Sequence, residues 1–253
     1  MGTTTATGTW LRRFHPADDA TVRMVCFPHS GGSAAYFFPV SRGLSPDVDV
    51  LSVQYPGRAE RRAEPCVTDV RAMADLVVDE LLPWCDRPLA LFGHSLGGMV
   101  AFEVALRLQE LGTPPVALFA SGRRAPSAHR EEPYMHLAAE DHLMEVVLDL
   151  GGTGGASRNP AAEQLLRLAL PALRGDLQAA ETYRYRPGPL LTCPVTVLNG
   201  DVDSRVTLRE ATAWRKHTAA ATEFRWFPGG HFYLDSHRPA LLDLLRAALL
   251  PAR

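Results

Sequence analysis

The segment PLALFGHSLGG, residues 88–98, places a sharp turn between a short apolar run and a stretch that favours a helix. Its serine, Ser95, has one glycine two positions before it and another two positions after it. In a nucleophile elbow, a serine on a strained strand-to-helix turn holds its hydroxyl above the end of a sheet, and the flanking glycines let strand and helix pass closely. The pattern therefore predicts an α/β fold and makes Ser95 the candidate nucleophile.

Apolar runs of strand length recur along the chain, rich in Val, Leu and Phe and without strict polar alternation. Such runs are typical of parallel strands that are covered on both faces. They lie at residues 23–28, 48–53, 89–92, 116–121, 195–199 and 224–227. Helical patterns separate them, at residues 67–84, 96–111, 205–218 and 239–250. This alternation predicts a mostly parallel, doubly wound sheet.

The alternation fails between residues 122 and 188, where the chain has mainly helical patterns and a glycine-rich break at residues 151–155. We expect one domain over residues 1–253 with residues 122–188 inserted as helices. Asn159 and Pro160 read as a helix cap and first helical residue, and the following apolar face is interrupted at Pro171. From this pattern alone, the helices either form a lid or pack on the core.

Composition excludes several classes of function. The 253 residues carry a formal net charge of −2 and no basic run, so nucleic acid is not an expected partner. No stretch approaches the roughly 20 apolar residues that cross a bilayer, and the N-terminus lacks a secretory leader pattern, which predicts a cytoplasmic protein without membrane association. The four cysteines form no CxxC pair, so neither a metal site nor a disulfide framework is expected.

A serine nucleophile needs a base, and that base needs a carboxylate to orient it. In this type of sheet the order is Ser, Asp or Glu, then His, each on a loop after a strand. Asp201 follows the strand PVTVLN, and His231 follows FRWF through a Pro-Gly-Gly turn. We prefer His231 to His217 and His237, which belong to helical patterns. Asp203 is the rival to Asp201, and we interpret it as the cap of the next helix because Asp201 is nearer to the strand end.

The tetrahedral intermediate needs two N–H donors for its oxyanion. The backbone N–H of Leu96, directly after the nucleophile, is the first candidate. The loop Pro28–Gly32, reading PHSGG after the first predicted strand, is similar to the HGGG-type loop of esterases. It supplies the N–H of Ser30 as the second candidate, although the same residues also suit an ordinary tight turn.

Several stretches together resemble the type II thioesterases, which are stand-alone α/β-hydrolases of polyketide and nonribosomal peptide synthases. The resemblance runs from about Val22 to near the end of the chain. It is carried by FPHSGGSA, QYPGRAERR, LFGHSLGGMVAFE, LPALRGDLQAAETYRY and FPGGHFYL. It departs in the loop after Asp203, where the family often has a proline.

The resemblance implies hydrolysis of acyl groups from the phosphopantetheine arm of carrier proteins, which clears stalled or misprimed synthases. It implies Ser95, Asp201 and His231 as a triad and the N–H groups of Ser30 and Leu96 as oxyanion hole. It also implies a monomer without metal or diffusible cofactor, whose partners are carrier domains, and a lid at residues 122–188.

The arginines of GRAERR, namely Arg58, Arg61 and Arg62, are candidates to meet the arm's phosphate or the carrier surface. A solvated charged turn, with Glu60 and Glu64 balancing the arginines, fits the same pattern. The alternatives to the carrier-protein thioesterase are a general carboxylesterase or lipase on the same scaffold, and a catalytically silent protein that binds carrier domains.

Overall fold

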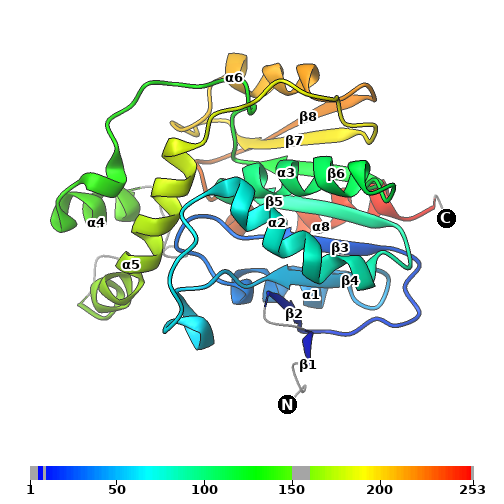
Figure 1. The fold of residues 1–253 in the computed structure, drawn as a ribbon, viewed down its shortest axis with the longest axis horizontal. Helices are drawn as coiled ribbons and strands as arrows, with labels where there is room; N and C mark the ends of the chain where they lie inside the picture. The colour runs from blue at the N-terminus through cyan, green and yellow to red at the C-terminus, as the bar shows by residue number, and fades with distance from the viewer. Residues whose placement is uncertain (1–4, 8–9, 150–159, 252–253) are drawn as a thin grey trace.

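The computed structural model describes residues 5–7, 10–149 and 160–251. Its centre is a sheet with the strand order β1-β2-β4-β3-β5-β6-β7-β8 (Figure 1). The strands are β1 (Thr5–Thr7), β2 (Leu11–Arg13), β3 (Arg23–Phe27), β4 (Asp49–Val53), β5 (Leu89–His94), β6 (Ala117–Ser121), β7 (Val195–Gly200) and β8 (Thr222–Phe227). Strands β3 to β8 pair in parallel, and β1 and β2 are antiparallel. The predicted parallel sheet is confirmed, and β1 and β2 extend it beyond the prediction.

Helices connect the parallel strands, as the sequence patterns predict. They are α1 (Phe38–Leu44), α2 (Val70–Leu81), α3 (Leu96–Glu110), α4 (Glu140–Asp149), α5 (Pro160–Thr182), α6 (Leu208–Thr212), α7 (Tyr233–Ser236) and α8 (Arg238–Leu249). Single 3₁₀ turns are η1 (Ala34–Phe37), η2 (Ala59–Arg61), η3 (Leu82–Trp84), η4 (Met135–Leu137) and η5 (Ala213–Lys216). The helix predicted at residues 205–218 is shorter, because it is divided between α6 and η5.

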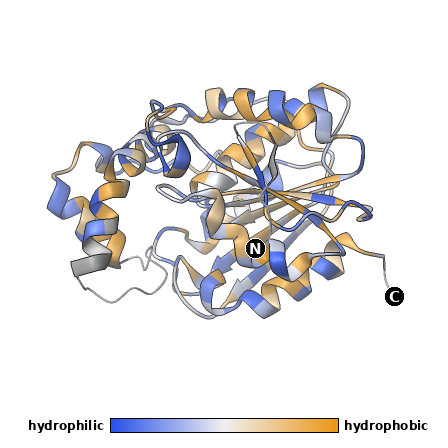
Figure 2. Ribbon diagram, turned by 90° about the horizontal axis from the view of Figure 1, so that it is seen from below, coloured by the Kyte–Doolittle hydropathy of each residue, from blue (hydrophilic) through white to orange (hydrophobic). Residues whose placement is uncertain are grey.

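Two hydrophobic layers cover the two faces of the sheet. Strand β3 shows why: Val25 and Phe27 belong to the layer under α2 and α3, whereas Met24 and Cys26 belong to the layer under α1 and α8. Successive side chains of a strand point to opposite faces, so a strand covered on both sides must be apolar at every position. Seen along the sheet, the helices lie above and below the strands (Figure 2).

The chain between β6 and β7 contains η4, α4 and α5, and these helices extend to one side of the sheet (Figure 1). Leu143 and Leu166 belong to a separate small apolar cluster between α4 and α5. Helix α5 continues through Pro171, so the predicted interruption there is wrong. The predicted glycine-rich break at residues 151–155 and the Asn159 cap lie outside the described residues.

No helix in the described part of the chain is both long and apolar enough to span a membrane.

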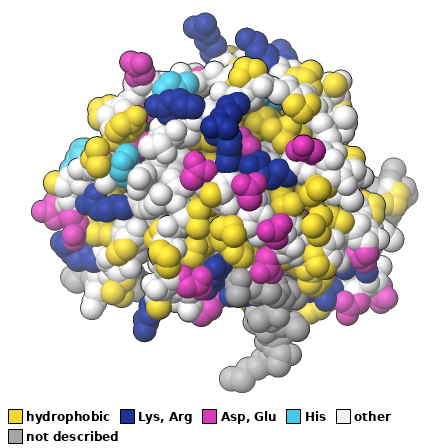
Figure 3. All heavy atoms as spheres, in the orientation of Figure 1, with side chains coloured by type: hydrophobic (Ala, Val, Ile, Leu, Met, Phe, Trp, Pro, Cys, Tyr) yellow, Lys and Arg dark blue, Asp and Glu magenta, His cyan; other side chains and the backbone are white. Residues whose placement is uncertain are grey.

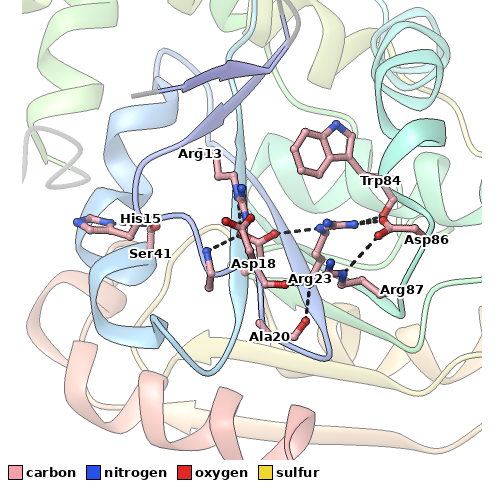
Figure 4. A network of polar contacts seen from close by, with 11 residues as sticks. Arg13, His15, Asp18, Ala20, Arg23, Ser41, Trp84, Asp86 and Arg87 are labelled. Atoms are coloured by element: carbon pink, nitrogen blue, oxygen red, sulfur yellow. Dashed lines mark hydrogen bonds and ion pairs between the residues drawn. The ribbon is translucent and has the colours of Figure 1, made fainter. Parts of the chain in front are cut away.

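A buried ion-pair network joins the end of β2 to the first residues of β3 and β4. Asp49, at the first position of β4, is fully buried and accepts hydrogen bonds from Arg13 Nε at 2.7 Å and Arg23 Nε at 3.0 Å. Figure 4 shows Arg23 extending from β3 toward Asp86 and the carbonyl of Trp84, which both accept from it. A buried carboxylate between two guanidinium groups locks β2, β3 and β4 together at this end.

We predict that Asp49→Ala lowers the free energy of unfolding by about 3–5 kcal/mol, because it removes the buried carboxylate that Arg13 and Arg23 share and leaves each with only an exposed partner, Asp18 or Asp86. Urea unfolding followed by circular dichroism measures the change. Asp86→Asn is the matched control, since Asp86 is exposed and an exposed ion pair contributes at most about 1 kcal/mol. Equal effects of the two substitutions would contradict this account of β2–β4.

Candidate active site

Ser95 occupies the turn between β5 and α3 in a strained conformation. Its φ is 54° and its ψ is −117°, a region that residues with a side chain rarely adopt. A Cβ at Gly93 would lie 2.1 Å from the carbonyl oxygen of Gly97, and a Cβ at Gly97 would lie 2.0 Å from that of Phe27. Only glycine fits at either position, so the elbow predicted from the sequence is confirmed.

His231 is paired with Asp203, and not with Asp201. His231 Nδ1 lies 2.9 Å from Asp203 Oδ2, and both side chains are buried. The exposed Asp201 instead accepts a hydrogen bond from the N–H of Gly229 at 2.9 Å. The prediction that Asp201 faces the imidazole is therefore wrong. The interpretation of Asp203 as a helix cap is also wrong, because Thr207 caps α6 in a capping box.

The backbone explains why the more distant aspartate faces the imidazole. The N–H of Asp201 donates to the carbonyl of Phe227 at 2.8 Å, which continues the ladder between β7 and β8 by one residue. The chain then turns back, and the N–H of Asp203 donates to the carbonyl of Gly200 at 3.4 Å. A Cβ at Gly200 would lie 2.2 Å from the carbonyl oxygens of Gly229 and Gly230. The loop before His231 therefore crosses directly over β7, and the turn delivers Asp203 to the imidazole.

Ser30, Ser95 and His231 line one cavity of about 250 Å³. A second cavity of about 90 Å³ shares these three residues and extends between apolar side chains of α4 and α5, among them Leu143, Leu173 and Leu177. No hydrogen bond joins the Ser95 hydroxyl to the His231 imidazole, although both residues are described. Such bonds are often long before substrate binds and shorten in the complex.

Of the two predicted oxyanion donors, Ser30 lines the same cavity as Ser95, and Leu96 directly follows Ser95. The N–H groups of Gly31 and Gly32 are taken, the first by Asp176 Oδ2 at 2.7 Å and the second by the carbonyl of His29 at 2.9 Å. The N–H groups of Ser30 and Leu96 donate to no acceptor within the described ranges. Leu96 is the first residue of α3, where an N–H has no partner inside the helix.

Arg58 holds the loop at residues 28–32 against α5. Its guanidinium forms a two-pronged ion pair with the buried Asp176, with Nη2 2.7 Å from Oδ1, and also donates to the carbonyl of Gly32 at 3.1 Å. The same carboxylate accepts the N–H of Gly31. Arg58 is therefore buried and fully engaged, and the prediction that it meets substrate phosphate is wrong. Asp176 was not among the predicted site residues, although it lies in the stretch LPALRGDLQAAETYRY that resembles the family.

Arg61 is also a structural residue. It is buried, donates to the carbonyl of Gln54 at 2.8 Å, pairs with Glu64, and stacks over Trp10 at 4.7 Å. Its predicted contact with substrate is therefore wrong. Arg62 is exposed, so its predicted role stays a prediction.

A layer of buried histidines lies behind the imidazole of His231. The ring centroids of His94 and His231 are 5.0 Å apart, and those of His29 and His94 are 6.0 Å apart. Burial lowers the pKa of His29 to about 3 and takes the pKa of His94 well below its usual value, and the nearby His231 adds to both effects. His94 Nδ1 is hydrogen-bonded to the Ser121 hydroxyl at 2.9 Å, which contacts the Tyr233 hydroxyl at 2.7 Å. Both histidines are thus neutral near pH 7 and add no positive charge beside His231.

No group of three or more His, Cys, Asp or Glu side chains that could hold a metal ion occurs among the described residues.

The elbow serine, the imidazole with its buried carboxylate and the two free N–H donors define a serine hydrolase of the α/β-hydrolase fold.

Comparison with known proteins supports this class of protein. A family model described as "Thioesterase domain" matches residues 22–249. The chain is 49% identical over 248 residues to "Thioesterase PikA5" of Streptomyces venezuelae, covering 97% of this chain and 87% of that protein. It is 47% identical over 244 residues to the "Probable cadicidin biosynthesis thioesterase" of Streptomyces griseus, covering 96% of this chain and 67% of that protein.

Among solved structures, that of "the type II thioesterase BorB from the borrelidin biosynthetic cluster" superposes with a TM-score of 0.92 and 44% sequence identity. The match covers 97% of this chain and 100% of that one. The chain therefore belongs to the thioesterase family, as a type II thioesterase, and the resemblance seen in its sequence is confirmed.

We predict that Asp203→Asn lowers kcat for thioester hydrolysis by about 1,000-fold or more, because the imidazole loses the carboxylate that orients it. Asp201→Asn is the matched control and should change kcat by less than about threefold, since the amide oxygen still accepts the Gly229 N–H and the site is exposed. Steady-state kinetics of both variants decide the assignment. A large loss in Asp201→Asn with a small one in Asp203→Asn would overturn it.

We also predict that Asp176→Ala lowers kcat by about tenfold or more with little change in KM, because the loop that carries the Ser30 N–H loses its attachment to α5. The exposed Gln178, two residues further along α5, provides the control variant Gln178→Ala. Thermal unfolding of both proteins separates a displaced loop from a general loss of folding. If kcat stays unchanged in folded Asp176→Ala, the carboxylate does not position the oxyanion loop.

Proposed function

We propose that this protein hydrolyses acyl groups from the phosphopantetheine arm of acyl or peptidyl carrier proteins, through a Ser95–His231–Asp203 relay. The observation that carries the proposal is the cavity that Ser95 and His231 share. Asp203 is hydrogen-bonded to Nδ1 of that imidazole. Its relatives are named as thioesterases of biosynthetic pathways, which supports a carrier-bound thioester as substrate.

In the first step, the Asp203 carboxylate accepts the Nδ1–H of His231, which leaves Nε2 free to act as a base. His231 takes the proton from the Ser95 hydroxyl as its oxygen attacks the thioester carbonyl carbon. The imidazolium then returns this proton to the departing thiol, and an acyl-serine remains. In the second step, a water molecule gives its proton to His231 and attacks the acyl-serine, which releases the carboxylic acid and restores the hydroxyl of Ser95.

The N–H groups of Ser30 and Leu96 stabilise the oxyanion of both tetrahedral intermediates. Their hydrogen bonds strengthen as charge develops on the oxygen, so they lower the barrier rather than merely retaining substrate. No metal or diffusible cofactor enters these steps.

Residues 122–188 form the lid of the proposed enzyme. Support comes from the cavity that extends from Ser95 between Leu143 of α4 and Leu173 of α5, where an acyl chain would be enclosed by apolar side chains. The lid belongs to the same domain as the sheet in this proposal. As the resemblance to type II thioesterases implies, we expect the enzyme to act as a monomer.

The proposal predicts that wild-type protein removes short acyl groups from a phosphopantetheinylated carrier protein, whereas Ser95→Ala leaves them in place. Intact-mass spectrometry of the carrier, before and after incubation, measures the loss. Unchanged deacylation by Ser95→Ala would exclude Ser95 as nucleophile.

Matched oxygen esters of the same acyl groups test a general carboxylesterase. Hydrolysis of the oxygen esters at least as fast as that of the carrier-bound thioesters would favour that alternative. Binding of carrier protein without any turnover by the wild type would favour a catalytically silent component.

A further inference from the structure

We propose that Arg123 and Arg205 form an anion-binding subsite beside Ser95, which takes the free carboxylate of a dicarboxylic acyl group such as malonyl. This inference rests on the proposed function and extends it to the class of acyl group. Both arginines line the 250 Å³ cavity together with Ser95 and His231.

Arg123 has no direct hydrogen-bond or ion-pair partner for its side chain among the described residues. It follows β6, and its Cβ packs 3.1 Å from the position that a Cβ on Gly98 would take, over the first turn of α3. Its Nε is buried without a hydrogen-bond partner, and its guanidinium forms no ion pair in the described part of the chain. Burial lowers the pKa of this guanidinium to about 9, with Arg124 and Arg205 adding to the effect and Glu132 opposing it, so it still carries its charge at neutral pH. A guanidinium with a buried, unbonded Nε is costly, and an anion from the substrate would offset that cost.

Arg205 approaches the same cavity from the loop after β7. Its backbone N–H donates to Asp203 Oδ1 at 2.8 Å, which fixes this residue next to the pair of Asp203 and His231. Its side chain makes no hydrogen bond or ion pair with any described residue. The two arginines thus come from the loops after β6 and β7. Neither side chain is bonded to a described residue, so both guanidinium groups can bind an anion.

The acidic side chains of this cavity are already occupied. Glu132 pairs with Arg124 at 2.7 Å and with Arg130 at 3.1 Å. Glu181 accepts the N–H groups of Met135 at 3.0 Å and His136 at 3.2 Å, and also bonds the His136 ring. On the face shown in Figure 3, Lys and Arg side chains lie intermixed with Asp and Glu toward the α6 end.

Proximity to the reacting atoms favours an acyl carboxylate over the arm's phosphate. Arg123 directly follows Gly122, at which a Cβ would lie 3.3 Å from His231 Cε1. In a malonyl thioester the free carboxylate stands next to the methylene that is bonded to the thioester carbonyl. The phosphate, in contrast, lies at the opposite end of the arm from the thiol. Two guanidinium groups that line the cavity of Ser95 and His231 therefore suit the carboxylate of the acyl group.

The test compares malonyl and propionyl thioesters of N-acetylcysteamine, a small thiol that carries no phosphate. We expect Arg123→Gln and Arg205→Gln each to lower kcat/KM for the malonyl thioester by about tenfold or more, because a charge-assisted hydrogen bond is lost. The propionyl thioester should change by less than about twofold. Arg209→Gln, which removes an exposed arginine of α6, is the matched control and should alter neither rate.

Thermal unfolding confirms that each variant is folded, and Arg123→Lys provides a second variant that keeps the charge. It should retain more malonyl activity than Arg123→Gln and less than the wild type, because Lys lacks the planar fork. Equal losses on both thioesters, or no loss on either, would overturn the subsite.

A loss confined to carrier-bound substrates, whatever their acyl group, would assign the arginines to the arm's phosphate and overturn the carboxylate assignment. So would a wild-type enzyme that hydrolyses only the propionyl thioester. Failure of the wild type on both thioesters and on acylated carrier protein would instead reject the proposed function itself.

Discussion

The close crossing of β5, α3 and the end of β3 is the constraint on which the site depends. Because residues 93 and 97 are glycines, neighbouring backbone atoms occupy the space that a Cβ would fill at each position. Ser95 takes a positive φ between them. The N–H of Ser95 donates to the carbonyl of Ser121 at 2.8 Å, which ties the turn to β6 as well. The strain of the turn is sustained because these neighbouring strands hold it, and the result is a hydroxyl at the edge of the cavity.

Much of this architecture could be predicted from the sequence, because a strand that is buried on both faces must be apolar throughout. That rule located β3 to β7, whereas β8 is an edge strand with no fully buried residue and was located from its Phe and Trp residues. The rule could not find β1 and β2, which have three residues each and include Thr and Arg. The interruption predicted at Pro171 failed because the rest of the long helix α5 retains its hydrogen bonds, and one missing N–H does not end it.

The site was less predictable, because the decisive contacts join residues distant in the chain. Ser95 and His231 could be located since each follows a strand through a glycine-containing turn. The choice between Asp201 and Asp203 depended on one extra ladder bond between β7 and β8, which no local pattern reveals. Arg58 appeared in a charged turn, yet its partner is Asp176, and only the fold brings them together. The charged turn holds one ion pair within itself, Arg61 with Glu64, whereas the partner of Arg58 lies on α5.

The central claim is that the acyl group passes through a covalent bond to Ser95. The most direct measurement is rapid-quench mass spectrometry of the Asp203→Asn enzyme mixed with an acylated carrier protein, followed by peptide mapping. The account predicts an acyl adduct on the peptide that contains Ser95, since a thioester is more reactive than the acyl-serine oxygen ester and the impaired His231 slows hydrolysis of the adduct more than its formation. Release of the acid without any adduct at Ser95, or with an adduct on another residue, would contradict it.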